Sequence, residues 1–238
     1  MTDALTFYRT GEHDCSYLAD KKAQTIFLDP AIELSQSILE TLSNHGFRRS
    51  GSHVYRPECH QCNACESTRV IIEQFKWRRS FKRILKQNQD IELRICESEF
   101  RQDHYDLFER YINERHSDGD MYPTSEQQYS DFLLEGFTQS YIVEFRLHGV
   151  LLGCTVIDLL FSGISAIYTW FDPDYADRSI GSLAILELIK LATRLPLPYV
   201  YLGYWIKGSS KMNYKSRFKP LESYKNDSWQ EIINESFE

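Results

Sequence analysis

The feature of this sequence with the clearest chemical potential is a basic and aromatic run near the C-terminus. Between Tyr204 and Leu221 it holds five cations and no carboxylate, with aromatic residues among them. Lysine and arginine neutralise phosphates and flat rings stack on bases, so the mixture favours nucleic-acid binding. The alternative interpretation is a solvated basic turn beside an aromatic core strand. The candidate nucleic-acid ligands in this run are Lys207, Lys211, Tyr214 and Lys215.

A second basic segment, Lys76–Lys86, contains six cations and no acid. Its apolar residues fall on one face of a helix and its basic residues fall on the other. Solvated helix faces usually mix acids with bases, so a face of one sign favours an anionic ligand over a merely solvated surface. The net charge is −7, yet the cations are concentrated in two segments, and the local field governs phosphate binding. The basic face consists of Arg79, Lys82, Arg83 and Lys86.

Four of the six cysteines form a candidate metal site. Cys59, Cys62 and Cys65 follow one another at intervals of three residues, and Cys15 precedes them in the N-terminal arm. Such spacing is typical of one limb of a zinc or iron–sulfur site, to which Cys15 would add a fourth thiolate. The alternative is a set of reduced structural thiols. The predicted ligand is therefore Zn²⁺ or an iron–sulfur cluster.

The elements that position these groups predict an α+β fold. Residues 47–56 are predicted to form one strand that leads into the cysteine cluster. After the basic helix, the patterns predict two helices, an antiparallel meander, a helix and a further strand. This is the order of an acetyltransferase-like (GNAT-like) domain. We place a boundary near residue 90, between a small cysteine-containing N-terminal domain with the basic helix, 1–90, and an acetyltransferase-like domain, 91–238. The helix predicted from about Ser179 to Arg194 begins in a possible phosphate loop formed by Arg178 and Gly181, although Leu183 departs from the superfamily pattern.

Hydropathy and the first residues predict where the protein works. No run approaches the roughly 20 apolar residues of a membrane helix, and the start lacks the basic and apolar regions of a signal peptide. We therefore expect a cytoplasmic protein without a membrane partner, in which thiols stay reduced.

Four long motifs occur in a fixed order along this chain: YRPECHQCNACESTRV, WRRSFKRILKQNQD, AIYTWFDPDYADRSIGSLAILE and YLGYWIKGSSKMNYKSRFKPLE. Together they closely resemble the bacterial aspartate/glutamate leucyltransferases, which are relatives of the eukaryotic arginyl-tRNA–protein transferases. The resemblance extends from Cys15 to the C-terminal basic run. One local departure is Ser210, which stands where the family pattern leads us to expect proline.

The resemblance implies an activity. Its members transfer an aminoacyl group from aminoacyl-tRNA to the α-amine of a protein's N-terminal residue. For bacterial relatives of this length, the group is leucine from leucyl-tRNA and the acceptor begins with Asp or Glu, which marks it for N-degron-dependent degradation. Leucine rather than arginine as the donor rests on this resemblance alone. The transfer itself needs no cofactor.

The reaction implied by this activity depends mainly on holding the two substrates together and needs only a modest contribution from a catalytic side chain. An α-amine has a pKa near ~8, so part of it is neutral at physiological pH, and holding amine and ester together supplies much of the acceleration. A group must still move a proton from the amine to the leaving ribose oxygen. The candidates near strand ends are Tyr168, Asp172, Tyr204 and Asp158, and the residues themselves do not rank them.

Cations must recognise an acidic acceptor, because arginine can bind a carboxylate through two hydrogen bonds. Arg79, Lys82 and Arg83 are the first candidates, followed by Arg69. The same side chains could instead contact tRNA phosphates, and the sequence does not separate these uses. The expected tRNA ligands are Lys86, Arg178, Gly181, Lys207, Lys211, Tyr214 and Lys215.

Two other functions fit part of the pattern. An acyl-CoA N-acyltransferase would share the scaffold and would bind acetyl-CoA but not aminoacyl-tRNA. A non-catalytic RNA-binding or metal-sensing module would bind charged and uncharged tRNA equally and would turn nothing over.

Overall fold

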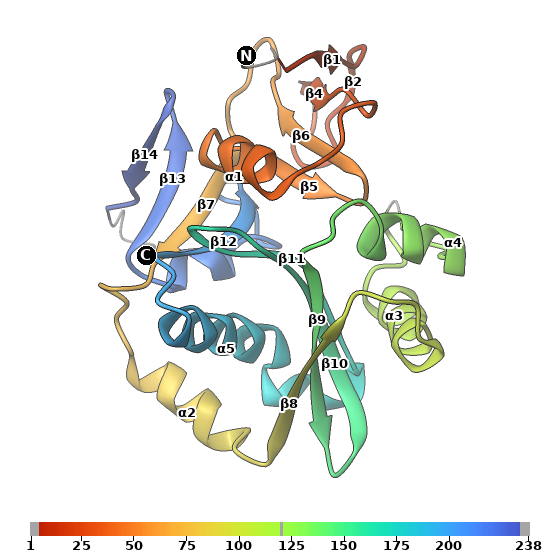
Figure 1. The fold of residues 1–238 in the computed structure, drawn as a ribbon, viewed down its shortest axis with the longest axis vertical. Helices are drawn as coiled ribbons and strands as arrows, with labels where there is room; N and C mark the ends of the chain where they lie inside the picture. The colour runs from red at the N-terminus through yellow and green to blue at the C-terminus, as the bar shows by residue number, and fades with distance from the viewer. Residues whose placement is uncertain (1–4, 120, 234–238) are drawn as a thin grey trace.

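A large mixed sheet forms the centre of the protein, which we describe from a computed structural model covering residues 5–119 and 121–233 (Figure 1). Its strands are β7 (Glu66–Ile71), β8 (Ile91–Glu97), β9 (Ser140–Leu147), β10 (Val150–Leu159), β11 (Gly163–Phe171), β12 (Tyr199–Trp205), β13 (Leu221–Lys225) and β14 (Ser228–Glu231). The strand order is β14-β13-β7-β12-β11-β10-β9-β8. The neighbouring strands are antiparallel except for β11 and β12, which run parallel.

A smaller sheet with the order β1-β4-β6-β5 contains the N-terminal strands. Its elements, with the adjoining hairpin and helix, are β1 (Phe7–Arg9), β2 (His13–Asp14), β3 (Lys22–Ala23), β4 (Thr25–Leu28), α1 (Gln36–Asn44), β5 (Arg48–Ser50) and β6 (His53–Pro57). The small sheet and α1 share a core with Leu160 and Tyr201 of the large-sheet region. The Tyr201 hydroxyl also donates to Asn44 of α1 at 2.9 Å. The N-terminal part is therefore packed against the large sheet.

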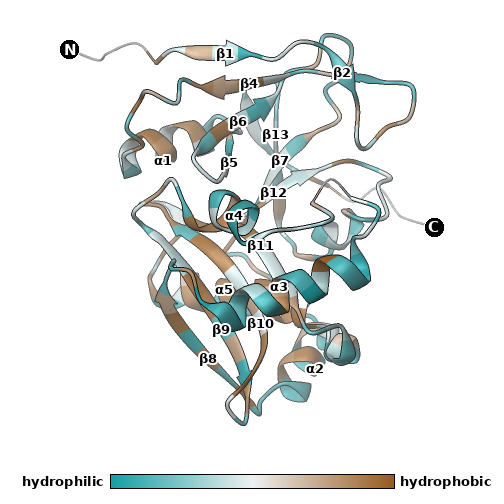
Figure 2. Cartoon of the chain, turned by 90° about the vertical axis from the view of Figure 1, so that its right-hand side faces the viewer, coloured by the Kyte–Doolittle hydropathy of each residue, from teal (hydrophilic) through white to brown (hydrophobic). Residues whose placement is uncertain are grey.

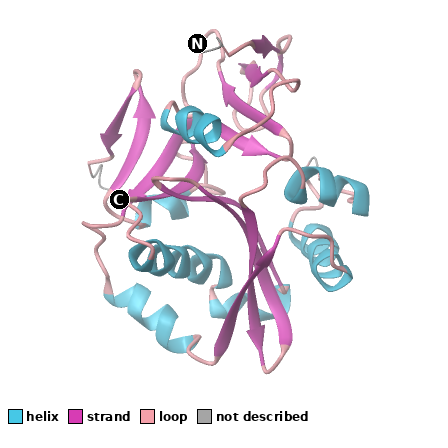
Figure 3. Ribbon diagram, in the orientation of Figure 1, coloured by secondary structure: helices cyan, strands magenta, loops and turns pink. Residues whose placement is uncertain are grey.

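Helices cover both faces of the large sheet (Figure 3). They are α2 (Arg79–Gln87), α3 (Gln102–Arg115), α4 (Glu126–Tyr129) and α5 (Ile180–Arg194), with a π-helical turn η1 (Ser130–Leu134) and 3₁₀ helices η2 (Pro173–Arg178) and η3 (Asn213–Arg217). One core lies under α5 and α2, and another lies under α3 and η1. Because α2 packs on α5 through Phe81 and Ile84, α5 is buried nearly all round. Figure 2 shows the mainly hydrophilic outer side of α3 in teal and the apolar strands in brown.

The structure confirms the basic helix, the meander of β9, β10 and β11, and the helix that follows them. The mixed architecture around a large sheet agrees with the coarse fold class.

The stretch expected as one strand over 47–56 is instead the hairpin β5–β6. It turns at Gly51, whose φ is +57° and where a Cβ would lie 1.9 Å from the carbonyl oxygen of Asp131. The expected boundary at residue 90 falls between α2 and β8, whereas β7 already lies inside the large sheet.

None of the described helices has both the length and the apolar character that crossing a lipid bilayer requires.

The parallel pair β11–β12 contains the feature that builds the site. The ladder joins Gly163 with Tyr199 through to Ser165 with Tyr201, and then it stops although both strands continue. From this point β12 pairs only with β7, with a register shift between Tyr201 and Gly203. We call the place where residues 166–171 of β11 part from residues 202–205 of β12 the strand fork.

Candidate active site

Two buried cations occupy the strand fork, and they come from segments far apart in the sequence. Arg48 of β5 is 4% exposed, and its Nη2 donates to the carbonyl oxygen of Ala166 on β11 at 3.0 Å. Lys215 of η3 is 8% exposed, and its Nζ donates to the carbonyl oxygen of Tyr204 on β12. Each cation therefore binds a backbone carbonyl of one strand where pairing between the strands has ended.

Neither fork cation has a carboxylate partner among the described residues. Nη1 of Arg48 is buried without a hydrogen-bond partner in that part of the chain. Asp158 acts on Arg48 electrostatically, but both its oxygens are bound by Arg49, at 2.6 and 2.7 Å. Burial lowers the pKa of Arg48, and burial together with Arg48 lowers the pKa of Lys215 to about 7. Two like charges out of water favour an anionic ligand that neutralises them.

Neither arginine of β5 is among the site residues predicted from the sequence. The available signal was an adjacent pair of arginines, Arg48 and Arg49, inside a stretch predicted to be a strand. Neighbouring strand residues point to opposite faces, so two such arginines reach two different environments. Arg49 binds Asp158 and holds two backbone carbonyls, those of Gly51 and Glu135, both at 2.8 Å. Arg48 is the one left with a free donor.

Beyond the fork, β11 carries Tyr168 among other aromatic rings. Tyr168 packs edge to face on Phe108 and Phe132, with ring centroids 6.0 and 5.4 Å away. Burial raises the pKa of Tyr168, and the nearby Tyr111 and Tyr214 act in the same direction. Tyr214 is 44% exposed as a residue, yet desolvation of its hydroxyl raises the pKa of that group to about 12. The structure thus brings a predicted proton-transfer residue close to a predicted nucleic-acid ligand.

The other three predicted proton-transfer residues have their polar atoms bound within the fold. The Tyr204 hydroxyl lies 2.9 and 3.1 Å from two backbone carbonyl oxygens, and burial raises its pKa. Asp158 is fully buried in its two-bond contact with Arg49. Asp172 accepts from Arg110 at 2.9 Å and caps the start of η2. Each of these contacts stabilises the folded protein, whatever else the residue does.

Arg69, one of four residues expected to bind an acidic acceptor, is held by its neighbours. Its guanidinium lies between the rings of Tyr199 and Trp229, at 3.7 and 4.1 Å from their centroids. Its Nε donates to Glu222 at 2.7 Å. Because its guanidinium already contacts this carboxylate and two rings, Arg69 is held within the fold. The other three residues, Arg79, Lys82 and Arg83, are exposed on α2, away from any ion pair within the described residues.

The two basic segments predicted separately form one surface. The ring of Phe81 on α2 stacks on that of Phe218, which follows η3. The amide of Lys76 donates to the carbonyl oxygen of Lys219 at 3.0 Å. Beside this joint, Arg78 and residues of the second basic segment, β13 and β14 line a cavity of about 610 Å³. We call it the cationic groove, although the carboxylates of Glu66 and Glu231 also line it. The cations that line this groove are Arg78, Lys207, Arg217, Lys219 and Lys225.

Four further predicted tRNA ligands lie at three places outside the groove. Arg178 binds Asp90 through two hydrogen bonds, at 2.8 and 3.1 Å, which joins the end of α2 to the start of α5. Gly181 is in the first turn of α5, where a Cβ would meet only Phe171, at an ordinary 3.7 Å. Lys211 is exposed and pairs with Asp118 at 3.0 Å. Lys86 is exposed on the basic face of α2.

The four clustered cysteines come from two segments and are all reduced. Cys59 Sγ contacts the backbone of Gln24, with N···S of 3.5 Å. Burial and the neighbouring thiols of Cys59, Cys15 and Cys62 raise the pKa of Cys65 to about 12. The fold therefore brings the distant Cys15 into electrostatic reach of Cys65, but no three of the four sulfurs, all of which are described, lie within 4.8 Å of one another.

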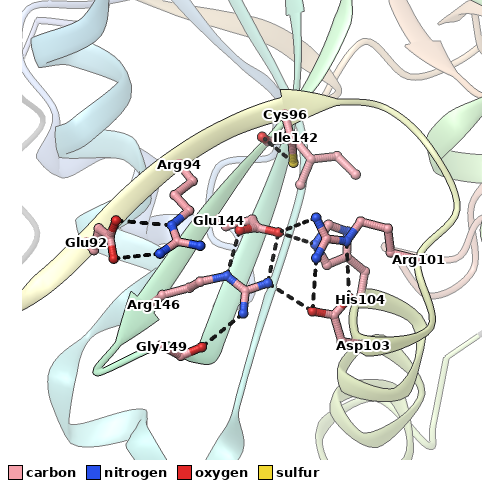
Figure 4. Close-up of polar contacts among 10 residues, drawn as sticks. All are labelled: Glu92, Arg94, Cys96, Arg101, Asp103, His104, Ile142, Glu144, Arg146 and Gly149. Carbon is pink, nitrogen blue, oxygen red and sulfur yellow. Dashed lines mark hydrogen bonds and ion pairs between the residues drawn. The ribbon is translucent and has the colours of Figure 1, made fainter.

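A second group of potential ligands lies where α3 faces β8 and β9 (Figure 4). Among the described residues, Cys96, His104 and Glu144 form the one group of three donors lying within 4.8 Å of one another. The oxygens of Glu144 are already bound by His104 at 2.8 Å and by Arg146 at 2.7 and 3.0 Å. Arg101 adds a contact of 3.3 Å. With this much positive charge on its carboxylate, the group serves as an ion-pair network that joins α3 to β9.

Known families cover most of this chain. The family model described as “Arginine-tRNA-protein transferase, C terminus” matches residues 103–225, and its N-terminal counterpart matches residues 13–83. The aspartate/glutamate leucyltransferase of Marinobacter nauticus is 46% identical over 228 residues, which are 96% of this chain and 96% of that relative. The protein of the same name from Pseudomonas fluorescens is 48% identical over 225 residues, covering 94% of this chain and 96% of the relative.

Solved structures are more distant. L-PGS from Bacillus licheniformis aligns with a TM-score of 0.47 at 10% identity, over 63% of this chain and 49% of that one. A functionally unknown conserved protein from Staphylococcus epidermidis aligns with a TM-score of 0.42 at 13% identity, over 84% of this chain and 66% of that one.

Proposed function

Because this chain belongs to the family of aspartate/glutamate leucyltransferases and arginine-tRNA-protein transferases, we propose that it transfers leucine from leucyl-tRNA to an N-terminal Asp or Glu. The observation that carries this proposal is the identity of 46% and 48% to leucyltransferases over 96% and 94% of the chain. The modified proteins would enter N-degron-dependent degradation. A cytoplasmic location and an acetyltransferase-like arrangement after a small N-terminal domain are part of the same proposal.

The reaction transfers one acyl group, the leucyl group, from an ester oxygen to an amine nitrogen. The neutral α-amine attacks the carbonyl carbon of the leucyl ester, so a C–N bond forms and the C–O bond to the terminal ribose breaks. The proton lost from the amine ends on the ribose hydroxyl. An amide is more stable than an ester, so the main demand on the protein is to hold both substrates in contact. Among the four predicted groups, Tyr168 is our candidate for the proton transfer, because Tyr214, a predicted tRNA ligand, acts on it electrostatically.

The tRNA would dock on the surface formed by the cationic groove and the exposed face of α2. Both elements present cations that phosphates can approach, and the Phe81–Phe218 stack holds them together. The short helix η3 connects this surface to the strand fork, because Arg217 lines the groove while Lys215 lies buried in the fork. A single-stranded 3′ end that passes η3 would meet Tyr214, which is 44% exposed and available for stacking.

The four clustered cysteines would hold Zn²⁺ or an iron–sulfur cluster. Four thiolates are a donor set that both take, and a cation relieves the repulsion between neighbouring thiolates. Cys65 lies near the fork, since it acts electrostatically on both Tyr55 and Tyr204. The group would support the local fold, and no step of the transfer is routed through it.

Incubation with leucyl-tRNA and short peptides tests the proposal. Peptides that begin with Asp or Glu should gain one leucine, detected by mass spectrometry, whereas a peptide that begins with Ala should not. Replacing leucyl-tRNA by acetyl-CoA should give no product. Acetylated peptides would instead identify an acyl-CoA N-acyltransferase. Equal binding of charged and uncharged tRNA, without any product, would identify a non-catalytic RNA-binding module.

The docking surface is tested by the salt dependence of leucyl-tRNA binding. Replacing the exposed Arg217 by alanine should weaken binding and reduce the slope of log K against log salt by about 1, the loss of one phosphate contact. An unchanged slope for Arg217→Ala would show that the cationic groove is not part of the tRNA interface.

A further inference from the structure

We propose that Arg48 and Lys215 together bind the side-chain carboxylate of the acceptor's N-terminal Asp or Glu, and so select the acceptor. The inference rests on the proposed function, which supplies an acidic acceptor as substrate. It assigns the selection to two buried cations in the strand fork and not to Arg69 or to the exposed cations of α2.

The unpaired charge of the fork is the first argument. Two cations that are 4% and 8% exposed share the fork, and no described carboxylate pairs with either. Burying a charge without a partner is costly, and a second like charge beside it adds to that cost. The adjacent Arg49 is equally buried, but its charge is neutralised within the fold. Its Nε and Nη2 both donate to the carboxylate of Asp158. The fork lacks such a carboxylate, and a substrate can supply it.

The donors and the space of the fork fit one carboxylate. Arg48 keeps Nη1 unbound, and Lys215 uses one Nζ hydrogen on the carbonyl of Tyr204, which leaves two others. Gly203 opens the space in front of them. A Cβ at this position would lie 3.6 Å from Lys215 Nζ and 4.0 Å from Arg48 Nε, with no other atom within 4 Å. An atom placed there would touch both cations without displacing described backbone.

The location also suits the reaction. The fork lies between two strands whose pairing has ended, so it is a place where an extended peptide end can reach backbone groups of the sheet. Tyr214, adjacent to Lys215 in η3, is 44% exposed and acts electrostatically on Tyr168. A carboxylate held by the fork cations would therefore place the α-amine of the same residue near the aminoacyl ester.

Such a site rejects uncharged acceptors. An N-terminal Asn has the shape of Asp, but it would leave both fork cations without a counter-charge. Sites built for a specific polar group discriminate strongly against analogues that lack it. We expect kcat/KM for an Asp-starting peptide to exceed that for its Asn-starting counterpart by at least about 100-fold.

The test compares Arg48→Met and Lys215→Met with charge-matched control variants at exposed positions outside the fork, Arg94→Met and Lys22→Met. Three quantities are measured for each full-length protein: kcat/KM with Asp- and Asn-starting peptides, Kd for leucyl-tRNA, and Kd for the Asp-starting peptide. For the two fork variants we expect the Asp-over-Asn preference to fall to within about 3-fold. We expect leucyl-tRNA affinity to change less than about 3-fold, and the controls to behave as wild type.

Two results would overturn the proposal, and a third would separate it from the proposed function. An intact Asp-over-Asn preference in both fork variants would show that other cations select the acceptor. A large loss of leucyl-tRNA affinity with unchanged peptide affinity would assign the pair to tRNA. If wild type transfers leucine to no peptide but binds the Asp-starting peptide through these residues, the proposed activity fails and the anion site stands.

A measurement on the unmodified protein covers the case in which the methionine variants do not fold. The ammonium of Lys215 is followed by NMR while peptide is added. Binding of the Asp-starting peptide should shift its signal and raise its pKa, because an adjacent carboxylate stabilises the charged form, and the Asn-starting peptide should do neither. Identical responses to both peptides would contradict the assignment.

Discussion

The ring of Phe81 stacks on the ring of Phe218, with centroids 5.1 Å apart and planes 6° from parallel. Both rings are fully buried, and Phe75 extends the stack at 5.8 Å from Phe81. Above this apolar joint, the two basic segments lie side by side and present their cations to solvent. The contact explains how a protein with a net charge of −7 concentrates positive charge on one surface.

Removing one ring of this stack should destabilise the protein. We expect Phe218→Ala to lower the free energy of unfolding by about 3–5 kcal/mol, because it leaves a cavity at a fully buried position. Denaturant unfolding followed by circular dichroism measures the change. The matched control is Phe161→Ala, at a side chain that is 64% exposed, which should change stability by less than about 0.5 kcal/mol. Equal effects would show that the stack adds nothing.

Reversing charge on the exposed face of α2 should weaken tRNA binding without unfolding the protein. For Lys82→Glu combined with Arg83→Glu we expect a large loss of leucyl-tRNA affinity, a shallower salt dependence and a nearly unchanged Tm. The control Lys21→Glu with Lys22→Glu makes the same charge change near β3. A loss of affinity as large in the control would show that net charge alone is responsible. Unchanged affinity in the α2 variant would take α2 out of the interface.

The buried pair Arg49–Asp158 should contribute to the stability of the folded protein and not to the proton transfer. We expect Asp158→Ala to cost about 3–5 kcal/mol of unfolding free energy, because Arg49 would remain buried and uncompensated. The double variant Arg49→Met with Asp158→Ala should recover part of that loss, since it removes the orphaned charge. A stable Asp158→Ala protein that binds both substrates but transfers no leucine would instead make Asp158 the proton-transfer group.

The buried Lys215 should give stability a specific pH dependence. Its pKa is lowered to about 7 by burial and by Arg48, whereas lysine in an unfolded chain titrates near ~10.4. Between these values the unfolded chain holds a proton that the folded protein does not, so raising the pH favours folding. Relative to Lys215→Met, the wild-type unfolding free energy should therefore rise from about pH 7 toward pH 10 and stay level below about pH 7.

Unfolding curves measured from pH 6 to pH 9.5 on both proteins check this dependence. The charged and titratable groups around the pair are Arg48, Tyr55, Tyr201, Tyr204 and Asp158. The pKa of each of these tyrosines is raised, so they keep their protons across this window. Parallel curves for the two proteins would mean that Lys215 keeps an ordinary pKa.

The clustered cysteines should bind metal together. We expect protein purified without oxygen to carry near-stoichiometric zinc or iron, and Cys62→Ser to lose most of it together with several degrees of Tm. Elemental analysis and thermal unfolding measure the two effects. Cys96→Ser is the matched control, because this half-buried thiol contacts the Ile142 carbonyl outside the cluster. Metal-free wild type with full activity would reduce the four cysteines to packing residues.

Local patterns were sufficient to predict the elements that depend on local physics. The apolar spacing of Phe81 and Ile84 predicted the helix α2 and its basic face, because a helix repeats every 3.6 residues whatever surrounds it. The alternation in β9 to β11 predicted the meander for the same kind of reason. The hairpin at Gly51 escaped the prediction because its turn is set by contact with the backbone of Asp131, far along the chain.

The sequence by itself determined the two basic segments, the cysteine spacing and, through its long motifs, the family. It did not determine the use of each cation. Lys211 and Lys215 look alike in the sequence, yet one is exposed beside Asp118 and the other is buried beside Arg48. Only the tertiary structure decided this, because burial and charge pairing depend on residues that folding brings together from distant segments. Arg48 became a candidate site residue when β5 met the end of the β11–β12 ladder, and that meeting exists only in the folded chain.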